Sequence, residues 1–178
     1  MDNIIIRDFN LEDAEAFLQM NIENKDYFEK WMPVLPPESF YTLEGHIERI
    51  KGIYERSAKD ESYSFGIFLE NSNTLIGDIS LYFVRRGPHE TCMMGYALSK
   101  KHTGKGYATK AVTLALDIAF NKLNLHRVIA EAQPENIGSI RVLEKAGFTR
   151  EGYARKNLKV NGEWKDHVCM AILREDNF

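Results

Sequence analysis

A lysine between two glycines stands in the stretch Lys101-His102-Thr103-Gly104-Lys105-Gly106, which is a candidate ligand-binding loop. Glycine lets a backbone approach a ligand closely and adopt a positive φ without a Cβ penalty. The stretch follows a strand-like run and precedes a long apolar helical run, so it should open a helix whose first N–H groups lack partners and carry partial positive charge. These features suit a phosphate group, although the same glycines would also serve a simple strand-to-helix turn.

The spacing around this loop excludes two common nucleotide motifs. A Walker loop would need glycine at position 99 and Ser or Thr at position 106, where the chain has Ser99 and Gly106. A dinucleotide fingerprint would need a third glycine at the position of Thr109. A phosphate-bearing ligand at this loop would therefore belong to another class.

A second motif begins 32 residues after Gly104 and has the form Asn-x-x-Ser, followed eight residues later by Gly-Phe. It runs from Asn136 to Phe148. Together with the glycine loop, it resembles the two signatures of the GNAT superfamily of acetyl-CoA-dependent N-acetyltransferases. That family begins its loop signature with Gln or Arg, where this chain has Lys101.

Further features resemble one branch of the family, the RimJ/RimL-type acetyltransferases of ribosomal-protein N-termini. The Gly-Phe ending followed by Glu151-Gly152 is similar to that branch, as are Asn161-Gly162 with Asp166 and Trp31-Met32-Pro33. The resemblance spans nearly the whole chain. It implies acyltransferase activity with acetyl-CoA as cosubstrate and without a metal.

The resemblance also implies how acetyl-CoA is held. Backbone N–H groups from about Thr103 to Ala108 are expected to receive the pyrophosphate. Lys101 or Lys105 could add a charge contact or remain solvated. The pantetheine arm is expected along the strand at 91–98, if it splays from the strand at 127–132 as in the family. The predicted cofactor contacts are Tyr96, Ala97, Leu98, Lys101, Thr103, Gly104, Lys105, Gly106, Tyr107, Ala108, Thr109, Asn136 and Ser139.

Acetyl transfer to an amine requires a free amine, a stabilised oxyanion and a proton for the departing thiolate. A backbone N–H of the strand at 91–98 would face the oxyanion. Many relatives donate the proton from a tyrosine at the position of Leu143, which cannot donate. RimL-type relatives assign this role to a serine that matches Ser139, which could otherwise merely cap its helix.

The general base is less clearly specified. RimL-type relatives place a glutamate at the position of Leu158, so that assignment fails in this chain. Glu131 matches a base position in another protein-acetylating branch, but it could equally be a surface carboxylate or part of an ion pair. An α-amine with a pKa near 8 is about a tenth deprotonated at pH 7, whereas a lysine near 10.4 is below about a thousandth. A weakly specified base therefore favours an α-amine acceptor.

The acceptor site is predicted only coarsely. Trp31, Met32 and Tyr82 could wall the acceptor groove, although aromatic side chains at such spacings also belong to apolar cores. The favoured reaction is direct transfer to a protein N-terminus in a ternary complex. The alternatives are a small amine, such as a polyamine, amino acid or antibiotic, and a non-catalytic acyl-CoA-binding regulatory module.

The hydrophobic pattern predicts the elements that would position these groups. Strand-like and helical runs follow one another in the order β-α-α-β-β-β-α-β-α-β-β, which predicts an α/β fold with a mixed sheet and helices on both faces. The resemblance implies a largely antiparallel sheet with one splayed parallel pair. Asn10 is expected to cap the first helix, Gly147 to end the fourth and Asn161-Gly162 to turn the last hairpin. The strands are expected at 4–9, 63–70, 75–84, 91–98, 128–132, 148–158 and 164–173, and the helices at 11–24, 42–58, 108–123 and 137–146.

The composition is that of an ordinary soluble protein, with 178 residues, 44% hydrophobic, 28% charged, and a net charge of −3. It predicts a single domain over residues 1–178, without a membrane span and without the basic surface of a nucleic-acid-binding protein. The N-terminus lacks the basic and then apolar build of a signal peptide. Cys92 and Cys169 are expected to be reduced and buried, in a cytoplasmic monomer or homodimer.

Overall fold

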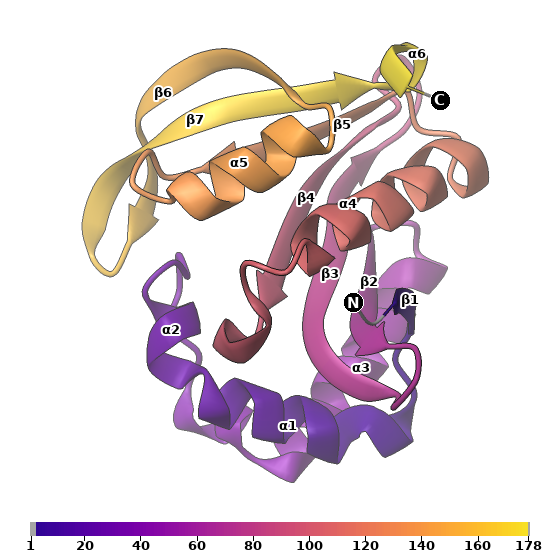
Figure 1. Cartoon of the computed structure of the whole chain (residues 1–178), viewed down its shortest axis with the longest axis vertical. Coiled ribbons are helices and arrows are strands. Elements are labelled where there is room, and N and C mark those ends of the chain that lie inside the picture. The colour runs from indigo at the N-terminus through magenta and orange to yellow at the C-terminus, as the bar shows by residue number, and fades with distance from the viewer. Residues whose placement is uncertain (1–2, 178) are drawn as a thin grey trace.

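Seven strands form one mixed sheet (Figure 1). In chain order they are β1 (Ile4–Asp8), β2 (Ser62–Leu69), β3 (Thr74–Arg85), β4 (Thr91–Leu98), β5 (Arg127–Ala132), β6 (Thr149–Val160) and β7 (Glu163–Leu173). Across the sheet the order is β1-β2-β3-β4-β5-β7-β6, and neighbours are antiparallel except for β4 and β5. The computed structural model describes residues 3–177, so both ends of the predicted 1–178 domain lie outside the described residues.

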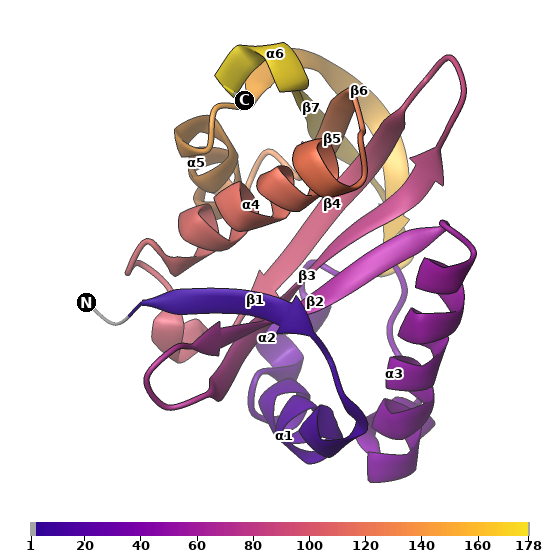
Figure 2. The same ribbon diagram turned by 90° about the vertical axis from the view of Figure 1, so that its right-hand side faces the viewer.

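Helices cover both faces of the sheet, as the sequence predicts (Figure 1 and Figure 2). On one face, α1 (Ala14–Glu23) packs against β3, and α3 (Leu43–Ala58) packs against β2 and α1. On the opposite face, α4 (Tyr107–Asp117) contacts β1 and β3, and α5 (Ile137–Lys145) contacts β5 and α4. The predicted order of seven strands and four long helices is therefore confirmed.

Several short helical segments were not predicted. A five-residue helix, α2 (Lys25–Glu29), follows α1, and a final turn, α6 (Arg174–Asn177), follows β7. The predicted helix at 108–123 is formed by α4 together with a π-helical turn over Ile118–Lys122 that continues it. Segments of one turn are too short for hydrophobic periodicity to reveal.

Two apolar cores lie on opposite faces of the sheet. The larger one lies between the strands and α4, where Ile79, Leu81 and Leu116 are fully buried. The smaller one lies beneath α1 and α3 and includes Phe17 and Ile50, which are also fully buried. The helical spacing of apolar residues therefore places one face of each of these helices against the sheet.

The strand β3 separates apolar from polar side chains. Because Ile79 and Leu81 point into the larger core and successive residues of a strand face opposite sides, Asp78, Ser80 and Tyr82 lie on the face covered by α1 and α3. That face therefore carries a row of polar groups beside β4.

The predicted helix end at Gly147 and the predicted turn at Asn161-Gly162 are formed, and α3 begins with a cap that was not predicted. Thr42 Oγ1 accepts a hydrogen bond from the Gly45 N–H at 3.0 Å and begins α3. Gly147 has a φ of +95°, which suits the left-handed residue after the end of α5. Asn161 and Gly162 both have positive φ values, +48° and +83°, and join β6 to β7 by the turn type that Asn-Gly favours.

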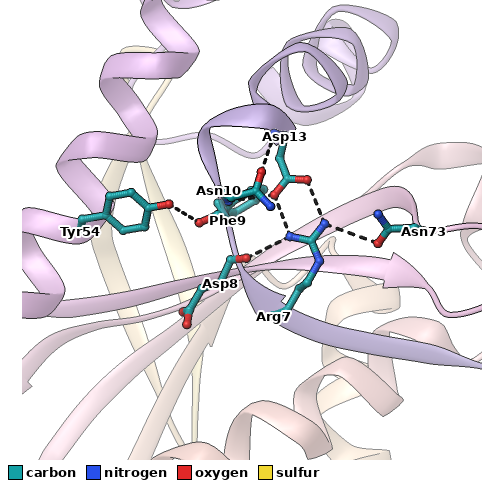
Figure 3. Close-up of polar contacts among 7 residues, drawn as sticks. All are labelled: Arg7, Asp8, Phe9, Asn10, Asp13, Tyr54 and Asn73. Atoms are coloured by element: carbon teal, nitrogen blue, oxygen red, sulfur yellow. Dashed lines mark hydrogen bonds and ion pairs between the residues drawn. The ribbon is translucent and has the colours of Figure 1, made fainter.

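The end of β1 is fixed by an ion pair and a capping box (Figure 3). The guanidinium of Arg7 donates to both carboxylate oxygens of Asp13, at 2.7 and 2.9 Å. Asp13 also accepts from the backbone N–H of Asn10 at 2.8 Å, and the Asn10 side chain accepts from the Asp13 N–H at 3.1 Å. The predicted cap at Asn10 is confirmed, and Tyr54 ties the same turn to α3 through the Phe9 carbonyl.

The parallel strands β4 and β5 pair over a short distance only. Their register covers Thr91–Met93 against Arg127–Ile129, whereas β5 continues alongside β7 as far as Ala132. Beyond Met93, β4 therefore has no pairing with β5 among the described residues. The predicted splay is confirmed, and it leaves an opening in the sheet beside residues 94–98.

The two cysteines are free, as expected, but they differ in burial. Cys92 is buried in the larger core, whereas Cys169 is partly exposed. The expectation that both are buried is therefore wrong for Cys169. Its register partner on β6 is Gly152, which has no side chain to cover it.

Candidate active site

The glycine loop forms a backbone cradle at the start of α4. Gly104 and Gly106 have φ values of +74° and +76°, and Gly106 caps the helix without a side-chain hydrogen bond. No atom lies within 4 Å of where a Cβ at Gly104 would stand. Within residues 3–177, the N–H groups from Gly104 to Thr109 have no protein acceptor. These free donors and the open space fit a pyrophosphate group.

A buried amide that the sequence did not reveal holds the start of this loop. Asn24, which is 6% exposed, donates to the Met20 carbonyl at 2.8 Å, within α1. Its Oδ1 accepts from the Lys100 N–H at 2.9 Å, and its amide contacts Ser99 Oγ at 3.2 Å. The loop is therefore anchored to the helix on the opposite side of the sheet opening. From the sequence, an asparagine at a helix end is ordinarily interpreted as a helix cap, so its contact with the loop is not predicted.

The basic residues of the loop lie mainly at its surface. Lys101 Nζ is 3.2 Å from a carboxylate oxygen of Glu23, and both side chains are exposed. Lys105 is also exposed. Burial lowers the pKa of His102, and the charges of Lys105 and Lys101 lower it further. The imidazole of His102 is therefore neutral near pH 7, and its Nδ1 is buried without a hydrogen-bond partner in the described part of the chain.

The predicted proton donor is joined to a tyrosine of β4. Asn136 caps α5 by accepting from the Ser139 N–H at 3.1 Å. Tyr96 Oη lies 2.9 Å from Ser139 Oγ and 3.2 Å from the Ser139 carbonyl oxygen. Burial raises the pKa of Tyr96 to about 12, so its phenol stays protonated near neutral pH. The predicted contacts Tyr96, Asn136 and Ser139 are therefore brought together beside the sheet opening, while Leu143 is buried in the core.

Glu131 lies on the other face of β5. Its neighbours Ala130 and Ala132 are buried in the core beneath α5, so the Glu131 side chain points away from that core. Asn157 donates to one of its carboxylate oxygens at 2.8 Å, and Cys169 Sγ lies 3.8 Å from the other. The structure therefore does not place Glu131 beside Ser139, but across the strand from it.

A cavity of about 380 Å³ lies on the same face, beneath α1 and α3. Tyr96 and Ala97 of β4 line it, so it borders the opening between the strands. Met32 and Tyr82, two of the three predicted acceptor contacts, also line this cavity. Trp31 is not among the lining residues, and its ring lies 4.6 Å from Lys30 Nζ.

The cavity also contains charged groups that the sequence did not predict as site residues. Arg49 and Arg56 of α3 and Asp78 of β3 line it, together with serine hydroxyls from β2 and β3. In the sequence, the arginines fit the polar face of an amphipathic helix. Asp78 fits the polar side of a strand with alternating residues. Only the packing of α3 over the sheet brings them together.

Neither a metal cluster nor a membrane helix is found in residues 3–177. No group of three or more His, Cys, Asp and Glu side chains in this range is arranged to hold a metal ion. No helix in this range is both long and apolar enough to cross a bilayer.

Residues 3–149 match the family described as the acetyltransferase (GNAT) domain. The chain is 48% identical to the probable N-acetyltransferase YjcK of Bacillus subtilis (strain 168), over 98% of this chain and 96% of that protein. It is 30% identical to the ribosomal protein uS5-alanine N-acetyltransferase of Escherichia coli (strain K12), over 98% of this chain and 90% of that one. A spermidine N(1)-acetyltransferase of Vibrio cholerae is 27% identical, over 85% of this chain and 82% of that protein.

Solved structures of related proteins have the same fold. The ribosomal-protein-S5-alanine acetyltransferase of Vibrio fischeri superposes with a TM-score of 0.91, at 30% identity, over 99% of this chain and 96% of that one. The Mycobacterium smegmatis RimJ in complex with CoA-disulfide gives a TM-score of 0.92, at 27% identity, over 98% and 83% of the two chains.

Proposed function

The chain belongs to the GNAT family of N-acetyltransferases, and on that basis we propose that it acetylates the α-amine of a protein N-terminus. One observation carries the proposal. The opening between β4 and β5 has the Tyr96–Ser139 pair on its α5 side and the cavity beneath α1 and α3 on its other side. A donor cosubstrate and an acceptor could therefore approach the same opening from opposite faces of the sheet.

The glycine loop would hold the acetyl-CoA pyrophosphate through its free N–H groups, between Gly104 and Thr109. Acetyl-CoA supplies an activated thioester. The pantetheine arm would follow the unpaired edge of β4 at 94–98, where Tyr96, Ala97 and Leu98 supply backbone groups. A backbone N–H of the same edge would face the thioester oxygen, where negative charge develops during the reaction.

Direct transfer forms a C–N bond and breaks the C–S bond. The attacking amine loses one proton, and the departing sulfur gains one. The hydroxyl of Ser139 donates that second proton, Tyr96, hydrogen-bonded to it and protonated near pH 7, restores it, and solvent then returns a proton to Tyr96. Neither cysteine suits a covalent acetyl-enzyme, because burial raises the pKa of both Cys92 and Cys169 and so disfavours the thiolate.

Glu131 is proposed to receive the proton of the amine, with a water molecule between them. Its carboxylate is held by Asn157 on the face from which the acceptor would enter. A relayed base of this kind suits an α-amine, because about a tenth of such amines are already neutral at pH 7. A fully protonated polyamine would demand more of the base.

The relatives support two acceptor classes to different degrees. The uS5-alanine acetyltransferase is 30% identical over nearly the whole chain, whereas the spermidine acetyltransferase is 27% identical over 85% of it. The higher identity and coverage with the uS5-alanine acetyltransferase favour a protein N-terminus as the acceptor. The spermidine relative keeps a small amine as the alternative acceptor. Leucines at 143 and 158, where relatives have a proton donor and a general base respectively, keep a non-catalytic acyl-CoA-binding module as the other alternative.

The test is to follow release of the CoA thiol by purified protein with three kinds of acceptor: peptides with free N-termini, spermidine and an aminoglycoside. Turnover should be highest with a peptide and should disappear when its N-terminus is blocked. Efficient turnover with spermidine alone would overturn the proposed acceptor. Tight acetyl-CoA binding without turnover of any amine would instead indicate the regulatory module.

A further inference from the structure

Three charged side chains face the cavity beneath α1 and α3. Arg49 and Arg56 come from α3, and Asp78 comes from β3. The side chains of Arg49 and Asp78 are 29% and 16% exposed, and both line the cavity. Two guanidinium groups and one carboxylate therefore give the cavity lining a positive balance of charge.

The guanidinium of Arg49 is held in place without using all of its donors. Its Cζ lies 4.3 Å from the ring centroid of Phe17 and 5.0 Å from that of Phe40, so the group makes cation–π contacts with two aromatic rings. Its Nη2 is 3.5 Å from a carboxylate oxygen of Asp78, which is too long for a strong hydrogen bond. Its Nη1 is buried and has no hydrogen-bond partner in residues 3–177.

A buried guanidinium donor without a partner is costly, and native proteins usually satisfy such groups. Burial lowers the pKa of Arg49, whereas Asp78 acts to raise it. Asp78 is the only carboxylate among the described residues that line the cavity, and its contact with Arg49 leaves Nη1 unsatisfied. A ligand with an oxygen acceptor would complete the hydrogen bonding of this group.

The distance from the opening to the Arg49–Asp78 pair matches the spacing of residues in an extended peptide. Along β3, Asp78 lies opposite Ala97 and Ser80 lies opposite Gly95, and both β4 residues border the opening. Two residues of a strand span roughly 7 Å, which is also the span of two residues of an extended peptide. An α-amine at the opening beside Gly95 therefore brings the first carbonyl groups of its own chain toward the Arg49–Asp78 pair.

We infer that Arg49 binds a main-chain carbonyl oxygen of a peptide acceptor, just downstream of the reactive amine, with Asp78 holding the guanidinium in position. Arg49 and Arg56 also repel polycations, so the cavity selects against polyamines. This inference rests on the proposed function, since it names the group that distinguishes a peptide acceptor from a simple amine.

The test compares an alanine dipeptide amide with an alkylamine of similar length that lacks the carbonyl. Arg49→Met keeps the long apolar stem and removes the donors. It should lower kcat/KM for the dipeptide amide by about tenfold or more, the usual effect of losing a hydrogen bond to a charged group. For the alkylamine, kcat/KM should change by less than about twofold, because that substrate makes no such bond.

The control variant is Lys51→Met, which removes one positive charge from the exposed side of the same helix. It should leave the preference between the two substrates unchanged. A binding readout independent of turnover is the titration of the dipeptide amide into protein saturated with CoA. Arg49→Met should weaken this binding and should leave the Kd of acetyl-CoA unchanged.

Two outcomes would overturn the inference. An equal loss for the dipeptide amide and the alkylamine would show that Arg49 has only a structural role. Spermidine turnover that Arg49→Met leaves unchanged would contradict the selection against polycations. If Arg49→Met is too unstable to assay, the double variant Arg49→Met/Asp78→Asn avoids an unpaired carboxylate and should show the same loss of discrimination. Failure of the proposed function is distinguishable, because the unaltered protein would then turn over no peptide acceptor, whether it acetylates spermidine alone or no amine at all.

Discussion

Tyr96 Oη lies 2.9 Å from Ser139 Oγ and so joins the splayed edge of β4 to the first turn of α5. The two residues are 43 positions apart in the chain. Asn136 caps α5 and so orients the turn that carries Ser139. Burial raises the pKa of Tyr96 and keeps its phenol protonated near neutral pH. The pair is therefore the natural place to test the chemistry.

The first prediction concerns the proton for the departing thiolate. Ser139→Ala should lower kcat by about a hundredfold, within the usual range for loss of a general acid, and Tyr96→Phe should lower it less. If the two hydroxyls act in one relay, the double variant should be little worse than Ser139→Ala. The measurements are kcat with a good peptide acceptor and the Kd of acetyl-CoA. An unchanged kcat in Ser139→Ala would show that this serine is not the donor.

The second prediction concerns the glycine loop, for which the chain offers a matched control. Gly104 and Gly87 have nearly the same φ, +74° and +71°, and at both positions the space that a Cβ would occupy is clear of other atoms to 4 Å. A valine at either site should cost about 1–3 kcal/mol of stability through backbone strain. Only Gly104→Val should raise the Kd of acetyl-CoA, by about tenfold or more, measured by calorimetry. An equal effect of both variants on binding would argue against the phosphate cradle.

The third prediction concerns Glu131. Glu131→Gln keeps the contact with Asn157 possible but removes the proton acceptor. We expect kcat/KM for an α-amine to fall about tenfold at pH 7, less than the usual effect of a base because the amine is already partly neutral. The loss should shrink toward pH 9, where the amine is largely deprotonated. A loss that is independent of pH would indicate a structural role for this carboxylate.

The fourth prediction concerns acid stability. Burial acts to raise the pKa of Asp13, but hydrogen bonds from Arg7 and from the Asn10 backbone outweigh it, so the pKa lies below its ordinary value. A lowered folded-state pKa stabilises the protein above the unfolded-state value, near 3.9, and this contribution is lost as the pH falls through the folded-state pKa. Asp13→Asn should therefore cost about 2 kcal/mol at pH 7 and progressively less below about pH 4.

Urea unfolding at pH 7 and at pH 3 would measure this difference. Glu12→Gln, in the same turn, is the control for removing one negative charge without breaking the Arg7 pair. It should have little effect at either pH. A penalty for Asp13→Asn that stays constant with pH would contradict the ionic origin of the contribution.

Much of the fold could be predicted from the sequence because its signals are local. The cap at Asn10, the glycine after α5 and the Asn161-Gly162 turn each depend on a few neighbouring residues, and each is formed as expected. The strand and helix order follows from periodicity in the same way. The opening between β4 and β5 came instead from the family resemblance, since splaying depends on residues far apart in the chain.

The candidate site could be predicted only in part, for the same reason. The positions of Gly104 and Ser139 follow from motifs, but the contact between Tyr96 and Ser139 arises when β4 and α5 pack together. Asn24, Arg49 and Asp78 carry no motif at all. They face the site because α1 and α3 fold back over the sheet, and no short stretch of sequence encodes that arrangement.

The amide of Asn24 has a consequence for the order in which the substrates combine. The helix that it ends also supplies Phe17 and Asn21 to the wall of the cavity, while its side chain holds Ser99 and Lys100 at the start of the glycine loop. Binding of acetyl-CoA at the loop should therefore restrict the motion of the α1 side of the cavity before an amine binds. Because linkage is reciprocal, a bound amine should tighten the protein's hold on acetyl-CoA by the same factor.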